Sequence, residues 1–207
     1  IEDPVEKNIR KVNQMQVNNT AGLTFDKGLR AILRQDPDII MVGETRDSET
    51  AAVSVRSAIT GHLVLSTLHT NDAVSSIVRL RDMGVPDYLL ASSLTGIIAQ
   101  RLVRKICRHC SYDDIPTDEE KFILGDDTKT VRRAKGCSHC SNTGYHGRIA
   151  IHEILFIDRN IRNMISDGVN IQKIYDYTLN VQHMTTLKTA ALRLVKNNIT
   201  TVDEFLR

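Results

Sequence analysis

The sequence contains no tryptophan, and aromatic residues make up only 4% of its 207 positions. Such a chain offers few rings on which the bases of a single-stranded nucleic acid could stack. Charge of either sign is also not in excess, because 27 Lys and Arg stand against 25 Asp and Glu, a formal net charge of +2. A nearly neutral chain exerts little long-range attraction on a polyanion. We therefore expect no nucleic-acid partner.

Long hydrophobic runs are absent as well. No apolar run approaches the roughly 20 residues of a membrane-spanning helix, and the chain does not open with a secretory signal. The 41% hydrophobic and 25% charged residues are ordinary for a globular protein with a core. We expect a cytoplasmic protein. Because the chain begins inside a motif described below, we interpret it as a piece of a longer protein.

Residues 36–72 organise the chain. This stretch holds an apolar run at 39–42, a helical pattern of apolar residues at 52–59 and a second apolar run at 63–68. The pattern predicts two strands joined by a helix, and a crossover of this length makes the strands parallel.

Polar side chains follow both predicted strands. After the first strand come Gly43, Glu44, Thr45 and Arg46, and after the second come Thr67, His69, Thr70, Asn71 and Asp72. The carboxyl ends of neighbouring parallel strands meet at one edge of a sheet, where ligands bind. This arrangement is expected of a site for a metal-bound phosphate. A solvated carboxylate is the alternative interpretation of Glu44.

Several motifs resemble those of the secretion ATPases of type II secretion and type IV pilus assembly. The opening IEDPVE is similar to the family's acidic Asp box, DIIMVGETRD to its Walker B motif and GHLVLSTLHTND to its His box. The motifs keep the family's order and spacing, and paired cysteines follow AQRL. The resemblance implies an α/β fold, with a partial RecA-like P-loop NTPase core, a tetracysteine zinc-binding subdomain and a C-terminal helical region. The phosphate-binding pattern G-x-x-x-x-G-K-[ST] does not occur in these residues.

The resemblance also implies a division into three parts. Residues 1–106 would be the C-terminal part of the RecA-like core, with the three boxes. Residues 107–140 would be the tetracysteine zinc module. Residues 141–207 would return a strand to the core and add the helical region.

The family's roles can be transferred to matching positions. Glu44 would organise Mg²⁺, Glu2 would help to position the attacking water, and His69 would sense the γ-phosphate of ATP. Glu2 could instead be an exposed turn carboxylate. His62 and His69 stand at opposite ends of one strand, about 20 Å apart, so they cannot both touch one phosphate. A structural role for His62 stays open. The predicted nucleotide-binding residues are Asp3, Glu6, Gly43, Arg46, His62 and Thr67.

All the cysteines fall in two C-x-x-C pairs separated by 26 residues: Cys107, Cys110, Cys137 and Cys140. Two such pairs in a cytosolic chain predict one zinc ion held by four thiolates. Four thiolates leave no open coordination position, so a structural role is expected. Disulfides are disfavoured in a reducing compartment, and a redox-active pair is the remaining alternative.

Apolar periodicity predicts the other elements. Helices are expected at 24–34, 73–83, 88–99, 161–165, 171–179 and 185–196, and strands at 99–103 and 149–155. Thr117 with Glu120, and Thr201 with Glu204, have the spacing of a capping box, which predicts a helix start at each place.

The resemblance implies a hexameric ATPase that binds ATP between subunits. It would act on the inner face of the cytoplasmic membrane, pushing on an inner-membrane platform protein to assemble pilins or pseudopilins. Type II secretion, pilus extension and DNA uptake all stay open, whereas the four cysteines argue against pilus retraction. Without a phosphate loop, these 207 residues alone are expected not to turn over ATP.

Two other classes of function are considered. Basic residues surround the cysteines, so a nucleic-acid-binding zinc domain on a RecA-like motor is one alternative. These residues are Arg101, Arg104, Lys105, Arg108, Arg132, Arg133 and Lys135. A non-enzymatic module that docks on a membrane platform protein is the other.

Overall fold

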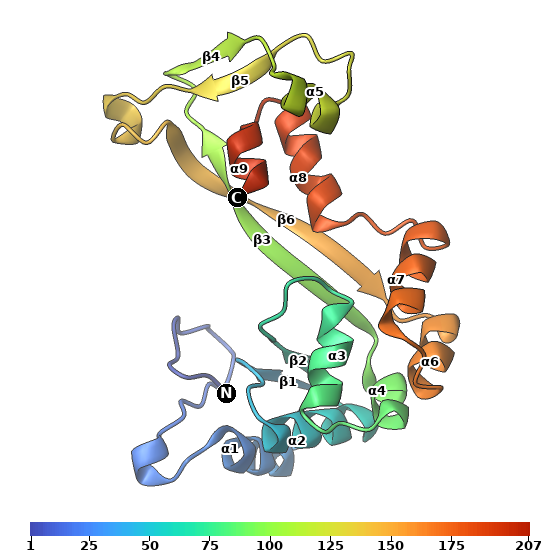
Figure 1. Ribbon diagram of the computed structural model, residues 1–207. Coiled ribbons are helices and arrows are strands. Elements are labelled where there is room, and N and C mark those ends of the chain that lie inside the picture. Colours follow the sequence, from blue (N-terminus) through green and yellow to red (C-terminus); the bar gives the residue numbers. More distant parts are fainter. The chain divides into compact units, whose positions relative to one another are not determined.

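The structure, a computed structural model, describes all 207 residues and divides into two compact units (Figure 1). The first unit comprises residues 1–97 and 155–178, and the second comprises 98–154 and 179–207. Each unit is therefore discontinuous in sequence. The three consecutive parts expected from the motifs are a functional division, which stays a prediction.

The first unit contains most of the helices. Its elements are the 3₁₀ turns η1 (Asn19–Ala21) and η2 (Leu33–Gln35), the strands β1 (Ile39–Val42) and β2 (Leu63–Ser66), and the helices α1 (Phe25–Ile32), α2 (Ser48–Ile59), α3 (Ser75–Asp82), α4 (Asp87–Ser93) and α6 (Arg159–Ser166). Helix α7 (Ile171–Asn180) begins in this unit and ends in the second.

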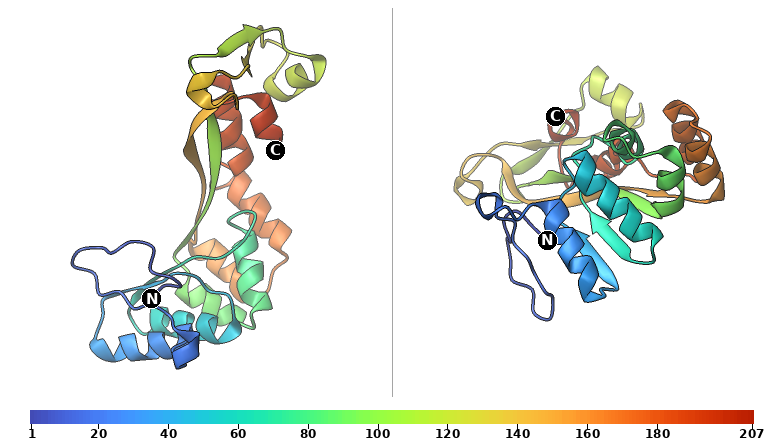
Figure 2. Two further views of the ribbon diagram at one scale, coloured as in Figure 1. Left: turned by 90° about the vertical axis from the view of Figure 1, so that its left-hand side faces the viewer. Right: turned by 90° about the horizontal axis from the view of Figure 1, so that it is seen from below.

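The strand-helix-strand prediction is confirmed. β1 and β2 pair in parallel, with Ile39 opposite Leu63 and Val42 opposite Ser66. Figure 2 shows α1 and α2 on one face of this pair. Alternate strand residues turn toward them, so Ile40 and Val42 are buried in a core cluster with Leu29 of α1 and Val53 of α2.

Two short segments extend the pairing beyond β1. The Gly43 N–H donates to the Ile1 carbonyl at 2.7 Å, and the Val17 N–H donates to the Glu2 carbonyl at 2.9 Å. Glu2 forms a parallel bridge with Gln16. The chain at Glu2 therefore runs beside the carboxyl end of β1.

The second unit is built around two long strands. Strand β3 (Gly96–Ile106) starts near the boundary of this unit, and strand β6 (Tyr145–Phe156) ends near it. The two strands are hydrogen-bonded neighbours. The remaining elements are β4 (Ser111–Asp114), α5 (Asp118–Leu124), β5 (Val131–Ala134), the 3₁₀ turn η3 (Ser138–Cys140), α8 (Leu187–Lys196) and α9 (Val202–Leu206). Val103 of β3 and Ile151 of β6 pack against Ala191 of α8.

One element prediction is wrong. The helix expected at 88–99 ends with α4 at Ser93, and the strand expected at 99–103 is the eleven-residue β3. Leu94 already has extended dihedral angles, and Thr95 accepts a hydrogen bond from the N–H of Ile157 at 3.2 Å. The partner of β3 is β6, some 50 residues further along the sequence, so local periodicity did not show where β3 begins and ends.

The other predicted helices are confirmed, with ends that differ by a few residues. The spacer between the cysteine pairs also contains a feature that was not predicted, the antiparallel pair of β4 and β5, with Ser111 opposite Ala134. We call this pair the β4–β5 hairpin, although α5 lies in the connection between its strands. The capping box of Thr117 and Glu120 is confirmed at α5. None of the helices combines the length and the hydropathy needed to span a bilayer.

Candidate functional site

The predicted phosphate edge lies where β1 and β2 end. The Thr45 N–H donates to the Thr67 carbonyl at 3.0 Å, so the two chains stay in register beyond the strands. The Thr67 hydroxyl donates to the Gly43 carbonyl at 2.6 Å. These contacts fix the backbone on both sides of Glu44. Thr67 therefore stabilises the backbone at this edge, a role that the sequence did not predict.

Glu44 is the centre of the edge. Its side chain is only 13% exposed, and one of its oxygens, Oε2, lies 2.5 Å from Arg46 Nε and 3.3 Å from His69 Nε2. Glu44 Oε1 has no protein partner. The structure thus brings together three residues predicted from two motifs 25 positions apart.

Glu2 reaches the same edge from the neighbouring segment. A Cβ added to Gly43 would lie 3.2 Å from the Glu2 Cα and from the Ile1 carbonyl oxygen, so a glycine lets the two chains approach closely. The Glu2 carboxylate accepts a hydrogen bond from Gln14 Nε2 at 2.8 Å.

The remaining predicted residues are not gathered with Glu44. Asp3 and Glu6 are exposed in the loop after Glu2 and have no ion pair. His62 lies at the opposite end of β2, where its Nδ1 is 3.0 Å from the Ser57 carbonyl at the end of α2. This contact favours the structural interpretation of His62, and its role in nucleotide binding stays a prediction.

Two residues that were given no individual role in the sequence analysis support the edge. Thr45 is 5% exposed, and its hydroxyl lies 2.8 Å from that of Ser66 in the adjacent strand. Asp47 caps α2, because its carboxylate accepts from the Thr50 N–H at 2.7 Å. An Asp three residues before a Thr at a helix start was the available signal for this cap.

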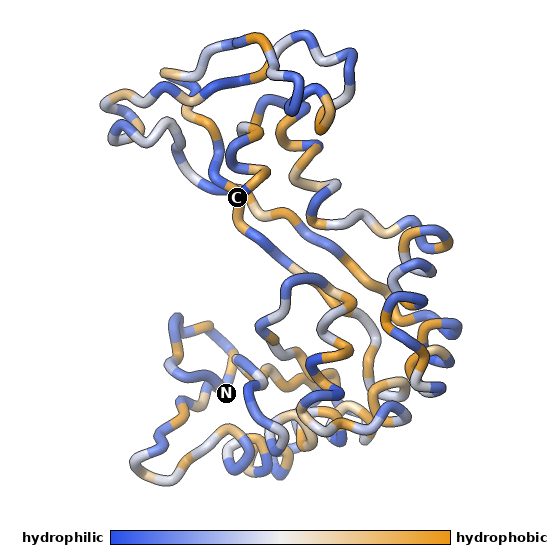
Figure 3. Tube along the Cα trace, viewed as in Figure 1, coloured by the Kyte–Doolittle hydropathy of each residue, from blue (hydrophilic) through white to orange (hydrophobic).

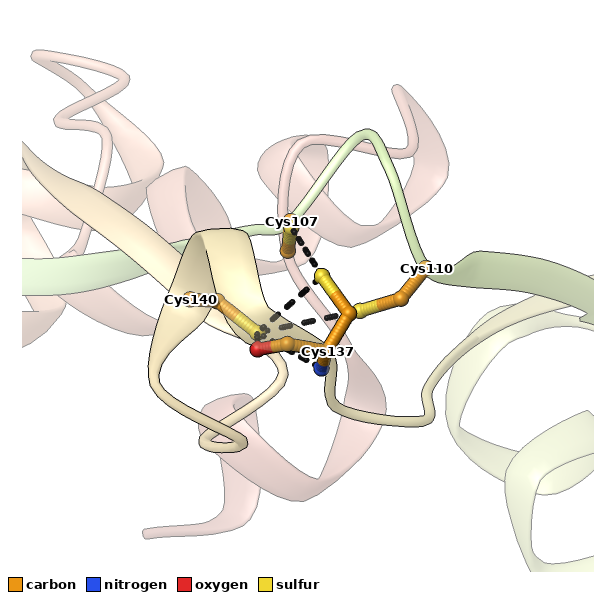
Figure 4. A group of neighbouring side chains, drawn as sticks. All are labelled: Cys107, Cys110, Cys137 and Cys140. Atoms are coloured by element: carbon orange, nitrogen blue, oxygen red, sulfur yellow. Dashed lines mark hydrogen bonds between the residues drawn. The ribbon is translucent and has the colours of Figure 1, made fainter.

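The four cysteine sulfurs converge between two loops (Figure 4). Sulfur distances are 3.9 Å for Cys107 and Cys137, and 3.8 Å both for Cys110 and Cys140 and for Cys137 and Cys140. All four sulfurs lie within 4.8 Å of one another. Zinc to sulfur bonds of about 2.3 Å in a tetrahedron place neighbouring sulfurs about 3.8 Å apart, so the donor set fits one Zn²⁺.

Backbone N–H groups surround these sulfurs. The Gly136 N–H lies 3.3 Å from Cys110 Sγ, and those of Cys137 and Gly144 lie 3.2 Å from Cys140 Sγ. Burial raises the pKa of the Cys140 thiol, but the two N–H donors and the neighbouring sulfurs outweigh it and lower the pKa to about 6. A thiolate is the form that binds metal. Gly136 has φ +98°, and a Cβ there would lie 2.8 Å from the Asn142 carbonyl oxygen.

The basic residues near the cysteines are partly neutralised within the fold. Arg104 pairs with Glu204 at 2.5 Å, and Arg132 pairs with Asp113 at 3.1 Å. Arg133 pairs with Glu120 at 2.5 Å. Three of the seven charges considered for nucleic-acid binding are therefore engaged in ion pairs.

Comparison with known proteins places this geometry in a family context. The family model described as "Type II/IV secretion system protein" matches residues 1–207. The chain is 47% identical to the type IV pilus assembly ATPase PilB of Thermus thermophilus, covering all of this chain and 24% of that protein. It is 45% identical to the type II secretion system protein HxcR of Pseudomonas aeruginosa, covering 41% of that protein. The chain thus spans less than half of these curated relatives.

Solved structures support the fold. The pilus retraction motor PilT with bound ADP superposes with a TM-score of 0.70 at 30% identity, over 99% of this chain and 50% of that one. The ATPase DotB of Legionella pneumophila gives 0.61 at 23% identity, over 92% of this chain and 44% of that one. The predicted α/β fold class, a partial RecA-like core with a tetracysteine cluster, is confirmed.

Proposed function

The chain belongs to the Type II/IV secretion system protein family, and from this we propose that it is the C-terminal part of a hexameric ATPase that powers type IV pilus or type II pseudopilus assembly. One observation in particular supports the proposal. Glu44, at the carboxyl end of a parallel strand, holds Arg46 and His69 on one oxygen and leaves the other open.

The residues at this edge fit the triphosphate end of Mg·ATP. Bound Mg²⁺ would neutralise charge that develops on the phosphates. Glu44 offers its open oxygen to the ion or its waters, and Glu2 accepts a hydrogen bond from the attacking water. His69 donates to the γ-phosphate. Gly43 and Thr67 hold the edge in shape, while Asp3, Glu6, Arg46 and His62 complete the proposed nucleotide-binding set.

The cysteines would hold one structural Zn²⁺. Four thiolates would occupy every position of a tetrahedral ion, so the ion would tie the two loops together at the base of the β4–β5 hairpin. The functional division then follows the three predicted parts, with the core at 1–106, the zinc module at 107–140 and the return strand and helices at 141–207.

The whole protein would be cytoplasmic and peripheral to the inner face of the cytoplasmic membrane. Its partners would be other copies of itself and an inner-membrane platform protein, on which ATP-driven domain motions push. These proposals rest on family membership, because the chain spans only 24% to 41% of the two curated relatives named above.

ATP hydrolysis by the full-length protein tests the proposal. Replacing the carboxylate in Glu44→Gln is expected to slow turnover by a factor on the order of 100 or more, the usual cost of losing one group that supports charge stabilisation in the transition state. Glu49→Gln, at an exposed acid of α2, is the matched control and is expected to keep full activity. Turnover that survives Glu44→Gln would contradict the proposal. Turnover by the 207 residues alone would contradict the expectation that they are inactive without a phosphate loop.

The two alternatives give different outcomes. A nucleic-acid-binding zinc domain requires DNA or RNA binding that weakens steeply with salt. A docking module would show no ATPase activity. It would still be captured by the platform protein, and Glu44→Gln would not change this capture.

A further inference from the structure

Glu44 and its two charged partners differ in their exposure to solvent. Glu44 is 13% exposed, whereas the side chains of Arg46 and His69 are 65% and 86% exposed. The acid is therefore fixed by its surroundings, and its two partners reach it from solvent. Arg46 is much the closer of the two, at 2.5 Å against 3.3 Å for His69.

The Arg46 guanidinium approaches Glu44 most closely through Nε. Its two terminal nitrogens, Nη1 and Nη2, pair with no other carboxylate. These nitrogens form the fork with which arginine recognises phosphate groups in two parallel hydrogen bonds. One guanidinium thus faces the acid on one side and can offer its fork to an anion.

We infer that Arg46 is a positioning residue that holds Glu44 in an ion pair and releases it when a γ-phosphate takes the guanidinium. The inference rests on the proposed function. A carboxylate oxygen that lies in a close ion pair is a weaker metal ligand and proton acceptor, because the neighbouring positive charge already stabilises its negative charge. The oxygen Oε2 of Glu44 would therefore add to the open Oε1 as a metal ligand or proton acceptor only when a triphosphate is present.

Arg46 can exchange Glu44 for a phosphate at a low cost in free energy. Arg46 is 65% exposed, and solvent weakens an ion pair on its exposed side, so a more highly charged anion can compete with Glu44 for the guanidinium. The γ-phosphate of ATP carries more charge than a carboxylate and accepts from both Nη atoms. ADP has no γ-phosphate, and with ADP the ion pair is expected to re-form and compete with Mg²⁺ for Glu44.

Equilibrium binding to the full-length ATPase tests this exchange without relying on turnover. Fluorescent ADP and a non-hydrolysable ATP analogue are titrated against wild type and Arg46→Gln, with Mg²⁺ and with EDTA. Arg46→Gln is expected to tighten Mg·ADP binding by about threefold to fivefold, because one exposed ion pair no longer competes. It is expected to weaken binding of the Mg·ATP analogue by about tenfold, because the charged fork is lost.

Changes of opposite sign distinguish this role from simple damage to the site. The double variant Glu44→Gln with Arg46→Gln is expected to lose the gain in Mg·ADP affinity, since the released acid is gone. With EDTA the gain is also expected to vanish. Arg30→Gln is the matched control, because Arg30 is 61% exposed and pairs with Asp26 at 3.7 Å outside the site.

Three outcomes overturn the inference. Weaker binding of both nucleotides in Arg46→Gln would make Arg46 an ordinary ligand, and unchanged Mg·ADP affinity would show that Glu44 was never withheld. A gain that persists in the double variant would place its origin elsewhere. A wild-type protein that binds neither nucleotide overturns the proposed function itself, and the inference with it.

Discussion

Two shielded glutamates show how similar residues differ in their contacts. Glu44 keeps one oxygen free of protein at the end of β1. Glu153 is 2% exposed on β6, and its carboxylate accepts from the N–H of Leu187, the first residue of α8, at 3.1 Å. A carboxylate at a helix N-terminus satisfies an otherwise unpaired donor and complements the helix dipole. Glu153 therefore stabilises the fold.

Glu153→Leu is expected to lower the free energy of unfolding by about 1–3 kcal/mol, because it leaves a buried donor of α8 unpaired. Glu153→Gln keeps an acceptor and is expected to cost less. Urea unfolding of the chain measures both changes. The exposed Glu119→Gln on α5 is the control for loss of charge. A Glu153→Leu variant as stable as the control would show that the contact with Leu187 contributes nothing.

The sequence supported predictions for residues that belong to motifs and missed those defined by distant partners. Glu44 and His69 were predicted to meet because parallel strands align their carboxyl ends, and they do. The contact of Glu153 with α8 spans 34 positions and depends on burial, which one sequence does not display. The role of His62 was left open because residue types alone do not show that its Nδ1 lies 3.0 Å from the Ser57 carbonyl.

Helix α5 is attached to the hairpin by buried charge. Arg133 of β5 donates to both oxygens of Glu120, at 2.5 and 2.8 Å, and also to Asp114 of β4 at 3.2 Å. The hydrogen bond from Arg133 is the main cause that lowers the pKa of Glu120, and the backbone N–H of Thr117 adds to it. The pair therefore joins α5 to both strands.

This lowered pKa predicts how stability depends on pH. A carboxyl group with a lower pKa in the folded state contributes its full stability above its unfolded value, about 4.3, and loses it as the pH falls through the folded value. The free energy of unfolding is thus expected to drop on acidification below about pH 5. Glu120→Gln is expected to flatten this dependence in urea titrations at several pH values. An equal slope in Glu120→Gln and wild type would contradict the assignment.

At the scale of elements, predictions succeeded where the pattern was local. β1, α2 and β2 follow from apolar periodicity, and α5 follows from its capping box. At α9, Thr201 caps the helix as expected, but the Glu204 carboxylate accepts from Arg104 and does not return to Thr201. Only residues 99–103 of the long strand β3 were predicted, because its partner β6 is distant in the sequence.

The cysteine loops give a prediction about metal. Elemental analysis of the purified chain is expected to find about one zinc per chain, because four thiolates saturate one tetrahedral ion. Cys107→Ser and Cys137→Ser are each expected to lose it and to expose the β4–β5 hairpin to protease. Ser138→Ala, between the second pair of ligands, is the control. Metal-free protein with four titratable thiols would contradict the site.

At the scale of the whole molecule, one apolar surface is conspicuous. The side chains of Ile39, Met41, Leu63 and Leu65 project from β1 and β2 and are 49% to 61% exposed. They lie on the face of the strand pair opposite the core cluster, and both strands are orange in the hydropathy colouring of Figure 3. Parallel sheets are normally covered on both faces, and contiguous apolar patches of this kind promote association.

The chain alone is therefore expected to bind an apolar dye and to self-associate. Met41 and Leu65 are register partners, so Met41→Lys with Leu65→Glu places opposite charges side by side on this face. The pair is expected to remove most of the dye signal and to lower the apparent mass in sedimentation, while stability changes by about 0.5 kcal/mol or less, as for surface substitutions. Tyr88→Lys, at a single aromatic residue that is 63% exposed on α4, is the control for an added charge. If dye binding falls equally in Tyr88→Lys, the surface that binds the dye lies outside β1 and β2. Dye binding that persists in both variants would show that this apolar face is not what holds copies of the chain together.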